Sequence, residues 1–237
     1  MLRSGLVAFA LTICAVAPAL AQNDEEEIVV TGSRLIAYES FAVPHVFITR
    51  RADFAVVEVE IRNDTRDAGA RLAEIVEALH RMEAGATRAR MTLVLVDDDI
   101  GIVRQYSQAA AEQIMEAERR ADTTRLTVRV RTAVTQADTL VSIQGRVANF
   151  VAGLPKPGRV EMSVGDTDLS MVNLEQYRDG MLQRVLAEGR ALSERVGGAQ
   201  VVTIGGLESQ VGFHRTSDLD LVLFIPYELS LDLSDHP

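Results

Sequence analysis

Apolar and polar residues alternate along several stretches of the chain, and each of these stretches predicts a strand. In the clearest one, Ala55, Val57, Val59 and Ile61 fall on one side, and mostly charged residues fall on the other. Because successive side chains of a strand point to opposite faces, residues 55–62 are expected to form a half-buried strand. Further strands are predicted at residues 28–32, 46–49, 91–96, 125–131, 160–164, 200–204 and 219–233.

Three segments, residues 65–85, 135–153 and 173–196, instead carry apolar residues at intervals of three and four, which predicts helices with one buried stripe. Gly189 lies on the stripe of the third helix, so we expect the backbone to approach a sheet closely there. The expected N-terminal caps are Asp64 or Thr65 for the first helix, a capping box of Thr135 and Asp138 for the second, and one of Asn173 and Gln176 for the third.

Residues 101–122 give conflicting signals. The alanine-rich run at residues 109–116 has high helix propensity, whereas an antiparallel sheet would gain from a strand that leads into the next one. Both assignments stay open.

The predicted order of elements indicates an α+β fold. A strand, a helix and a strand are followed by the open segment, a strand, a helix, a strand, the long helix and two strands. This order predicts helices packed on one face of a mixed or antiparallel sheet, with a long helix and a C-terminal strand pair, and it is compatible with two similar halves. We expect residues 53–237 to form one domain, preceded by a leader at residues 22–52 with a short strand and a loop.

Residues 1–21 have the features of a secretory signal peptide. One arginine precedes an apolar run at residues 6–16, and the sequence ALA supplies an A-x-A cleavage site after Ala21. The apolar run is too short to span a membrane. The mature chain is therefore expected in the periplasm, without a transmembrane segment.

The single cysteine, Cys14, lies within this signal peptide. It is not expected to carry a lipid, because Ile13 stands where a lipoprotein signal needs a small residue. The mature chain then has no cysteine, which excludes disulfides, thiol chemistry and cysteine metal sites.

The charge of the chain argues against two classes of partner. The net charge is -10 and the pI is about 4.9, whereas nucleic acids and anionic membranes are bound by basic surfaces. No nucleic-acid partner is expected.

No group of residues has the spacing of a catalytic, cofactor or metal site. Residues 97–99, DDD, lack the alternation and the glycine of a calcium loop and predict a solvated turn. No serine lies in a nucleophile elbow, and no glycine-rich phosphate loop occurs. The four histidines lack ligand spacing: His45, His80, His214 and His236. We therefore expect no cofactor, no metal and no enzymatic activity.

Two predicted strands carry opposite charges on the side away from their apolar face. Glu58 and Glu60 lie on the first, and Arg125, Arg129 and Arg131 lie on the strand at residues 125–131. Cross-strand ion pairs, worth about 0.2–1 kcal/mol each, are the simpler interpretation. An anion site is the alternative, but no glycine-rich loop or helix N-terminus accompanies the arginines.

The last predicted strand is more apolar than one buried face requires. Apolar residues occupy every odd position of residues 219–233, and Val222 and Phe224 make its middle apolar on both faces. Pro226 has no backbone N–H to donate to a neighbouring strand, which favours an edge strand or a bulge at this position. We expect part of this face, or the edge beside it, to be covered by a second copy of the chain or by the segment before Ala52.

Residues 27–34, EIVVTGSR, resemble the segment near the mature N-terminus of many TonB-dependent outer-membrane receptors. There a short extended peptide can add a strand to an energy-transducing partner. The residues that would dock are Ile28, Val29, Val30 and Thr31. The other interpretation is that they form the first strand of the domain. The chain is too short for a receptor barrel.

The order of elements resembles the SIMPL-domain family of secreted bacterial proteins. The matching segments are residues 28–33 (IVVTGS), 52–79, 125–134, 177–198, 201–206 (VVTIGG) and 221–231 (LVLFIPYELSL). The long interval between Gly32 and Ala52 and the alanine-rich segment near Ala110 depart from the family pattern. The resemblance implies a periplasmic or envelope-associated α+β domain without an established catalytic site, and it adds ring-like oligomers to the expectations.

Two hypotheses of function follow. In the first, the chain is an exported periplasmic structural or interaction protein of SIMPL type that associates with itself. In the second, it is a TonB-linked envelope accessory module that docks on an envelope protein through residues 28–31. They differ in whether that segment is free.

Overall fold

The fold is described from a computed structural model, which covers residues 27–30, 44–97, 102–114, 116–117, 122–196 and 201–232. The predicted signal peptide lies outside these residues. In chain order the elements are β1 (Glu27–Val30), β2 (Ile48–Arg51), β3 (Phe54–Asn63), α1 (Ala68–Arg88), β4 (Met91–Asp97), β5 (Ile102–Gln105), α2 (Gln108–Ile114), β6 (Glu116–Ala117), β7 (Thr124–Ala133), α3 (Leu140–Ala152), β8 (Val160–Val172), a 3-10 turn (Leu174–Tyr177), α4 (Arg178–Arg195), β9 (Val201–Gly205), β10 (Gly212–Arg215), β11 (Asp220–Phe224) and β12 (Glu228–Asp232).

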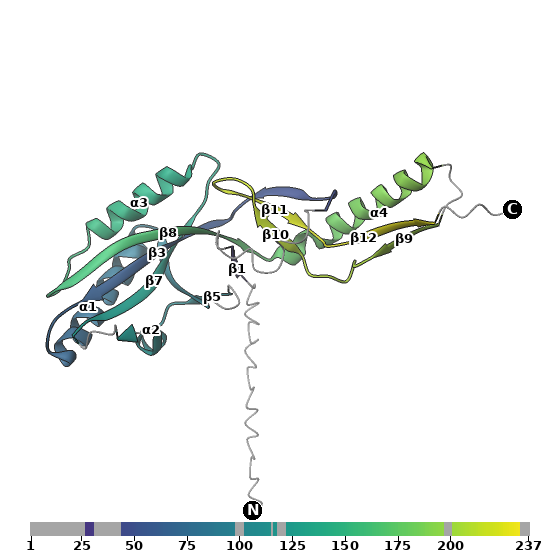
Figure 1. Cartoon of the computed structure of the whole chain (residues 1–237). Coiled ribbons are helices and arrows are strands. Elements are labelled where there is room, and N and C mark those ends of the chain that lie inside the picture. Colours follow the sequence, from purple (N-terminus) through teal and green to yellow (C-terminus); the bar gives the residue numbers. More distant parts are fainter. Residues whose placement is uncertain are drawn as a thin grey trace, which may run out of the picture.

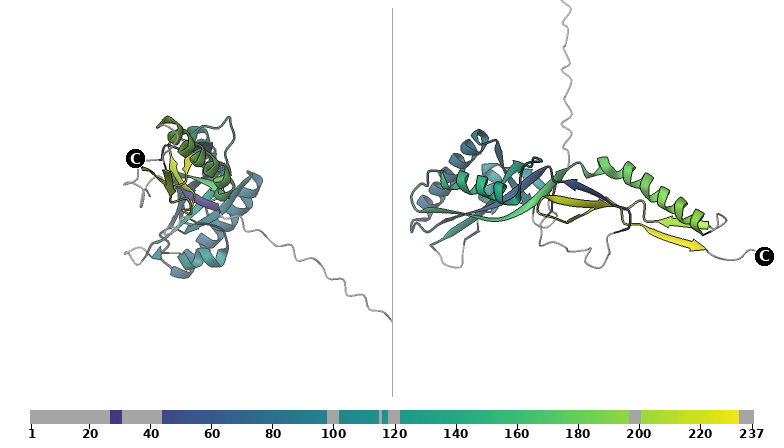
Figure 2. Two further views of the ribbon diagram at one scale, coloured as in Figure 1. Left: turned by 90° about the vertical axis from the view of Figure 1, so that its right-hand side faces the viewer. Right: turned by 90° about the horizontal axis from the view of Figure 1, so that it is seen from above.

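Three antiparallel sheets follow one another along an elongated molecule (Figure 1). The main sheet has the order β3-β8-β1-β5-β4-β7-β6, the second has the order β10-β11-β2, and the third contains only β12 and β9. Helices α1 and α3 lie at one end, and α4 lies with β9 and β12 at the other, as the view from above also shows (Figure 2). The α+β prediction is confirmed, including the long helix followed by a C-terminal strand pair.

The main sheet is closed on itself, because β3 pairs with β7 as well as with β8. β1 completes the ring between β8 and β5, and β4 joins β5 to β7. Residues 22–52, expected as a leader, thus contribute β1 to this sheet and β2 to the second one. One face of β3 therefore points outward to the helices, and the other points into the ring.

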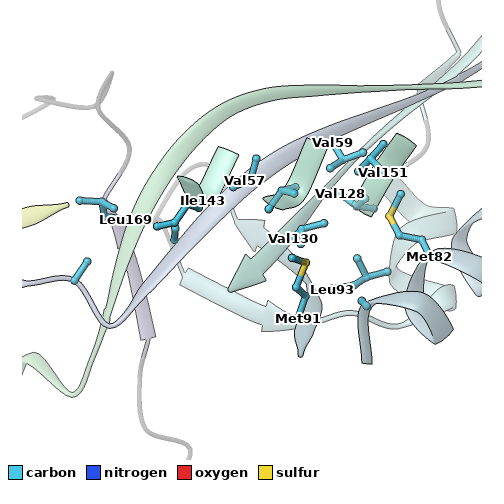
Figure 3. Packing of buried hydrophobic residues seen from close by; sticks show 14 of the residues in the cluster. Val57, Val59, Met82, Met91, Leu93, Val128, Val130, Ile143, Val151 and Leu169 are labelled. Carbon is cyan, nitrogen blue, oxygen red and sulfur yellow. The ribbon is translucent and has the colours of Figure 1, made fainter. Parts of the chain in front are cut away.

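The core lies between the outer face of this sheet and the helices α1 and α3 (Figure 3). Val57 and Val59 of β3 are fully buried there, as the alternation predicted. α1 contributes Met82 and α3 contributes Ile143 and Val151 to the same cluster. Inside the ring a smaller cluster forms around Val56 and Val94.

The expected start of each helix needs correction. α1 begins after Asp67, not Asp64 or Thr65, and the Asp67 carboxylate accepts from the Ala70 N–H at 2.7 Å. Residues Thr135 and Asp138 do bond to each other, but in a turn ahead of α3, whose capping box is formed by Thr139 and Ser142. The capping box that was expected at Asn173 does not form, because Asn173 has a left-handed backbone (φ 52°) and makes no side-chain cap.

The ambiguous segment combines both assignments. β5 pairs with β4 and β1, α2 follows, and the short β6 pairs with β7 at the sheet edge. Neither helix propensity nor strand continuity decided the whole segment.

The C-terminal region differs most from its prediction. The strand expected at residues 219–233 is two strands, because Ile225, Pro226 and Tyr227 separate β11 from β12. β11 pairs with β10 and β2, whereas β12 pairs with β9. The alternation continues through the break, so it gave no sign that the two halves belong to different sheets.

Candidate interaction surfaces

β1 is held in the main sheet on both sides. Its four residues pair with β8 from Leu169 to Val172, and Ile28 pairs with Ile102 of β5. Thr31, the last residue of the predicted docking segment, lies outside the described residues. In this conformation the backbone from Ile28 to Val30 is a domain strand, as the simpler interpretation of the sequence proposed.

A charged contact fixes the first residue of β1. The Glu27 carboxylate accepts from Arg131 Nε at 2.7 Å and from Ser170 Oγ at 2.5 Å. The Arg131 guanidinium also lies over the Phe54 ring, 3.3 Å from its centroid. Glu27, which the sequence placed in the leader at residues 22–52, is thus a partly buried contact that holds β1 in the sheet.

The arginine stripe of β7 pairs with carboxylates instead of forming an open anion site. The β3–β7 register places Arg129 opposite Glu58, and the two charges lie 3.6 Å apart. Arg129 Nη1 also donates to Asp168 Oδ2 of β8 at 2.9 Å. Cross-strand pairing is therefore confirmed. Asp168 was missed because β8 runs eight residues beyond the strand predicted at residues 160–164.

The burial of this stripe follows from ring closure. The Arg129 side chain is 10% exposed, whereas that of Arg125, which pairs with Glu60 at 3.6 Å, is 47% exposed. β1, β4 and β5 close the ring only around the Arg129 end of β7. Two arginines of the same strand therefore differ: Arg125 is largely in solvent, and Arg129 lies inside the protein.

Val222 and Phe224 are buried within the single chain. They are 5% and 3% exposed, and the Phe224 ring lies close over Gly212 of β10, where an added Cβ would come within 2.8 Å of it. The edge of β11 is covered by β2, with Leu223 opposite Ile48. Of the two covers that the sequence allowed, the segment before Ala52 is the one observed at this edge.

A hydrogen-bonded node ties the far ends of β3, α1 and β8 together. Glu74 of α1 accepts from Asn63 Nδ2 at 2.7 Å, from Thr65 Oγ1 at 2.8 Å and from the Arg159 N–H at 3.2 Å. The Asn63 hydrogen bond, followed by that of Thr65, lowers the pKa of Glu74 below its usual value. Arg159 also lowers the pKa of Asp64 through their paired hydrogen bonds at 2.5 and 2.8 Å. These hydrogen bonds and the ion pair give Glu74, Asp64 and Arg159 a structural role.

A groove of about 530 Å³ lies between the C-terminal halves of α1 and α3. Gly85, Phe150 and Leu154 line it together with Arg81 and Arg88. Arg81 pairs with Glu77 at 2.7 Å, and the lining has no carboxylate, hydroxyl or thiol group. The imidazole in the lining, that of His80, bonds to Gln108 at 2.9 Å.

The candidate chemical residues stay apart. His80 is exposed and bonds to Gln108 at 2.9 Å, and His214 lies in β10 of the second sheet, near the middle of the molecule (Figure 1). His236 and two of the three aspartates at residues 97–99 lie outside the described residues. Within the described part of the chain, no three His, Cys, Asp or Glu residues gather as a metal site. Nor is any helix there long and apolar enough to cross a membrane.

The end of the molecule formed by α4, β9 and β12, here called the arm, is thinly covered. α4 lies on β9 through Gly189, where an added Cβ would come within 2.8 Å of Ile204 Cδ1, as its place on the apolar stripe predicted. Arg178 fixes the base of the arm by donating to the carbonyls of Leu207 and Ser209 at 2.5 and 2.6 Å. Yet every side chain of β9 and β12 is exposed or only half-buried.

The arm also exposes apolar side chains at its surface. Leu186 is 41% exposed, Val196 is 37% exposed and Val201 is 65% exposed. Single exposed apolar residues are ordinary, but here three occur on one small projecting unit. The sequence VVTIG of β9 could have indicated this exposed unit, because it places apolar residues on both faces of a short strand.

No protein-family model, no curated protein and no solved structure matches this chain.

Proposed function

We propose that the chain is an exported structural or interaction protein of the periplasm, of SIMPL type, that associates with itself. The signal-peptide pattern of residues 1–21 supports export. The main sheet, its helices and the buried ion pairs supply a stable body.

The observation that carries self-association is the incomplete burial of the arm. A two-stranded sheet is marginally stable in water unless a third strand or further packing covers it. α4 supplies one cover, but it leaves Val202, Ile204, Leu229 and Leu231 only half-buried. A second protein surface would complete that burial.

The experiment is to export the full chain from a bacterial host and purify it from the periplasm. Mass spectrometry is expected to show a chain that begins at Gln22, and light scattering is expected to show a particle of more than one chain at micromolar concentration. A protein retained in the cytoplasm with residues 1–21 intact would overturn export. A monomer would overturn self-association.

The second hypothesis, docking of residues 28–31 on a TonB-type partner, requires β1 to leave its place. It would give up its pairing with β8 and β5 and the contact of Glu27 with Arg131. Hydrogen exchange separates the two proposals. Slow exchange of the amides of residues 28–30 speaks against docking, and exchange at the rate of a free peptide would favour it.

A further inference from the structure

The two open edges of the arm sheet differ in charge. Within the described chain, β9 pairs only with β12, so each strand has one edge without a strand partner. β12 carries Glu228 and Asp232, whereas β9 has the sequence VVTIG, without charge or proline. Proteins commonly guard open edges with charges, prolines or bulges. The β9 edge has none of these guards.

We propose that the β9 edge binds the β9 edge of a second copy of this chain. The strands would run antiparallel about a two-fold axis at Thr203 and form a sheet of order β12-β9-β9-β12. The inference rests on the proposed self-association and names its surface.

Self-pairing of β9 brings complementary residues together. Full overlap of this five-residue strand with its copy is centred on its middle residue, Thr203. Val202 then lies opposite Ile204 of the second copy, and Val201 lies opposite the second copy's Gly205. No charged residues meet, and Val202 and Ile204 stay on the face that α4 covers.

Self-pairing of β12 is disfavoured by the same reasoning. Its overlap centred on Ser230 places Glu228 opposite Asp232 of the second copy, twice, and like charges directly opposite each other are destabilising. In the proposed dimer these acidic strands are the outer edges instead. There they would oppose the addition of further strands and so end the assembly.

The helices come together in the same arrangement. α4 lies over β9, the strand next to the proposed axis. Pairing through β9 therefore brings two copies of α4 next to each other on one face of the combined sheet.

An apolar side chain of α4 is exposed close to this contact. Leu182, Leu186 and Gly189 stand at intervals of four and three, and Gly189 contacts β9. Leu186 is 41% exposed in the single chain. A second copy of α4 next to the first would cover it.

Thr203 and Ser230 provide a matched test. They lie opposite each other in the β9–β12 register, both are exposed, and both carry a hydroxyl. Thr203→Lys places two lysines across the proposed axis, whereas Ser230→Lys adds the same charge to the other strand. Light scattering of the exported chain gives the mass, and circular dichroism confirms that each variant is folded.

We expect Thr203→Lys to halve the particle mass and Ser230→Lys to leave it unchanged. Thr203→Asp is expected to behave like Thr203→Lys, and an equimolar mixture of the two is expected to recover the wild-type mass, because lysine then faces aspartate. Hydrogen exchange of the β9 amides that point away from β12 should be slow in the wild type and faster in either variant.

Each contrary result has a distinct meaning. A monomeric wild type would overturn both self-association and this surface. A wild-type oligomer that keeps its mass in Thr203→Lys would overturn only the β9 surface. If Thr203→Lys strengthens association while Ser230→Lys weakens it, β9 pairs with the acidic β12 edge of the next copy and the two-fold arrangement is wrong.

Discussion

Removal of the Arg129 guanidinium is expected to destabilise the fold more than removal of its partner carboxylate on Asp168. Arg129 faces two carboxylates, Asp168 at 2.9 Å and Glu58 at 3.6 Å. At an effective dielectric constant of about 20, each such pair attracts by roughly 4–6 kcal/mol before the cost of desolvation. The loss of Arg129 leaves two carboxylates together, whereas the loss of the Asp168 charge leaves one compensated pair.

The expected magnitudes follow from burial. The side chains of Arg129 and Asp168 are each 10% exposed, and leaving a buried charge without its partner costs about 3–5 kcal/mol. We expect Arg129→Met to cost that amount and Asp168→Asn to cost about 1–3 kcal/mol, because the amide keeps an acceptor. The double variant Arg129→Met with Asp168→Leu should cost less than Arg129→Met alone, because Glu58 can turn to water.

Urea denaturation followed by circular dichroism, at one protein concentration for all variants, measures these free energies of unfolding. Arg125→Met is the matched control: Arg125 lies on the same strand and faces Glu60 at 3.6 Å, but it is 47% exposed. Its cost should not exceed about 1 kcal/mol. Asp168→Asn costing as much as Arg129→Met would refute the compensating role of Glu58.

Three further changes have expected outcomes. Gly180→Ala should raise the free energy of unfolding by about 0.5–1 kcal/mol, since its Cβ would meet nothing within 4 Å. Gly189→Ala should lose that gain, because its Cβ would come within 2.8 Å of a β9 side chain. Equal effects of the two substitutions in urea denaturation would contradict the close packing. Ile143→Ala, at a fully buried position of α3, should cost about 2–5 kcal/mol in the same assay, and a cost typical of a surface site would show that α3 does not cover the core. Because Asn63 helps to hold the pKa of Glu74 below its usual value, the contribution of Glu74 to stability is present at neutral pH and is lost as the pH falls through the lowered pKa. Glu74→Gln should therefore flatten the fall of stability in the acidic range below pH 4.5, and an unchanged pH profile would contradict the role of the node.

Local patterns predicted much of the main sheet and its helices. The alternation of Ala55, Val57, Val59 and Ile61 identified the core face of β3, because one face of a sheet is buried against helices. The stripe of the third helix identified the position where Gly189 meets the sheet. Opposite charges on two strands predicted ion pairs. The β3–β7 register places Glu58 opposite Arg129, and Glu60 reaches Arg125 although the two are not directly opposite.

The helix ends and the buried charges were harder to predict. Asp64, Thr65 and Asp67 are all good capping residues, and only the path of the chain selected Asp67. Asp168 and Glu27 have polar sequence neighbourhoods, and their burial depends on closure of the ring by strands far apart in the chain. A charged residue with polar sequence neighbours is predicted to face solvent unless its partner on a distant strand is known.

The sequence by itself determined the α+β class, the core face of β3 and the close packing of α4 at Gly189, because side-chain period and local propensity act within one element. Only the tertiary structure decided that residues 219–233 divide between two sheets, that β2 covers the edge of β11, and that the arm ends in one charged and one uncharged edge. These features depend on which strands meet, and long-range pairing leaves the local alternation of apolar and polar residues unchanged.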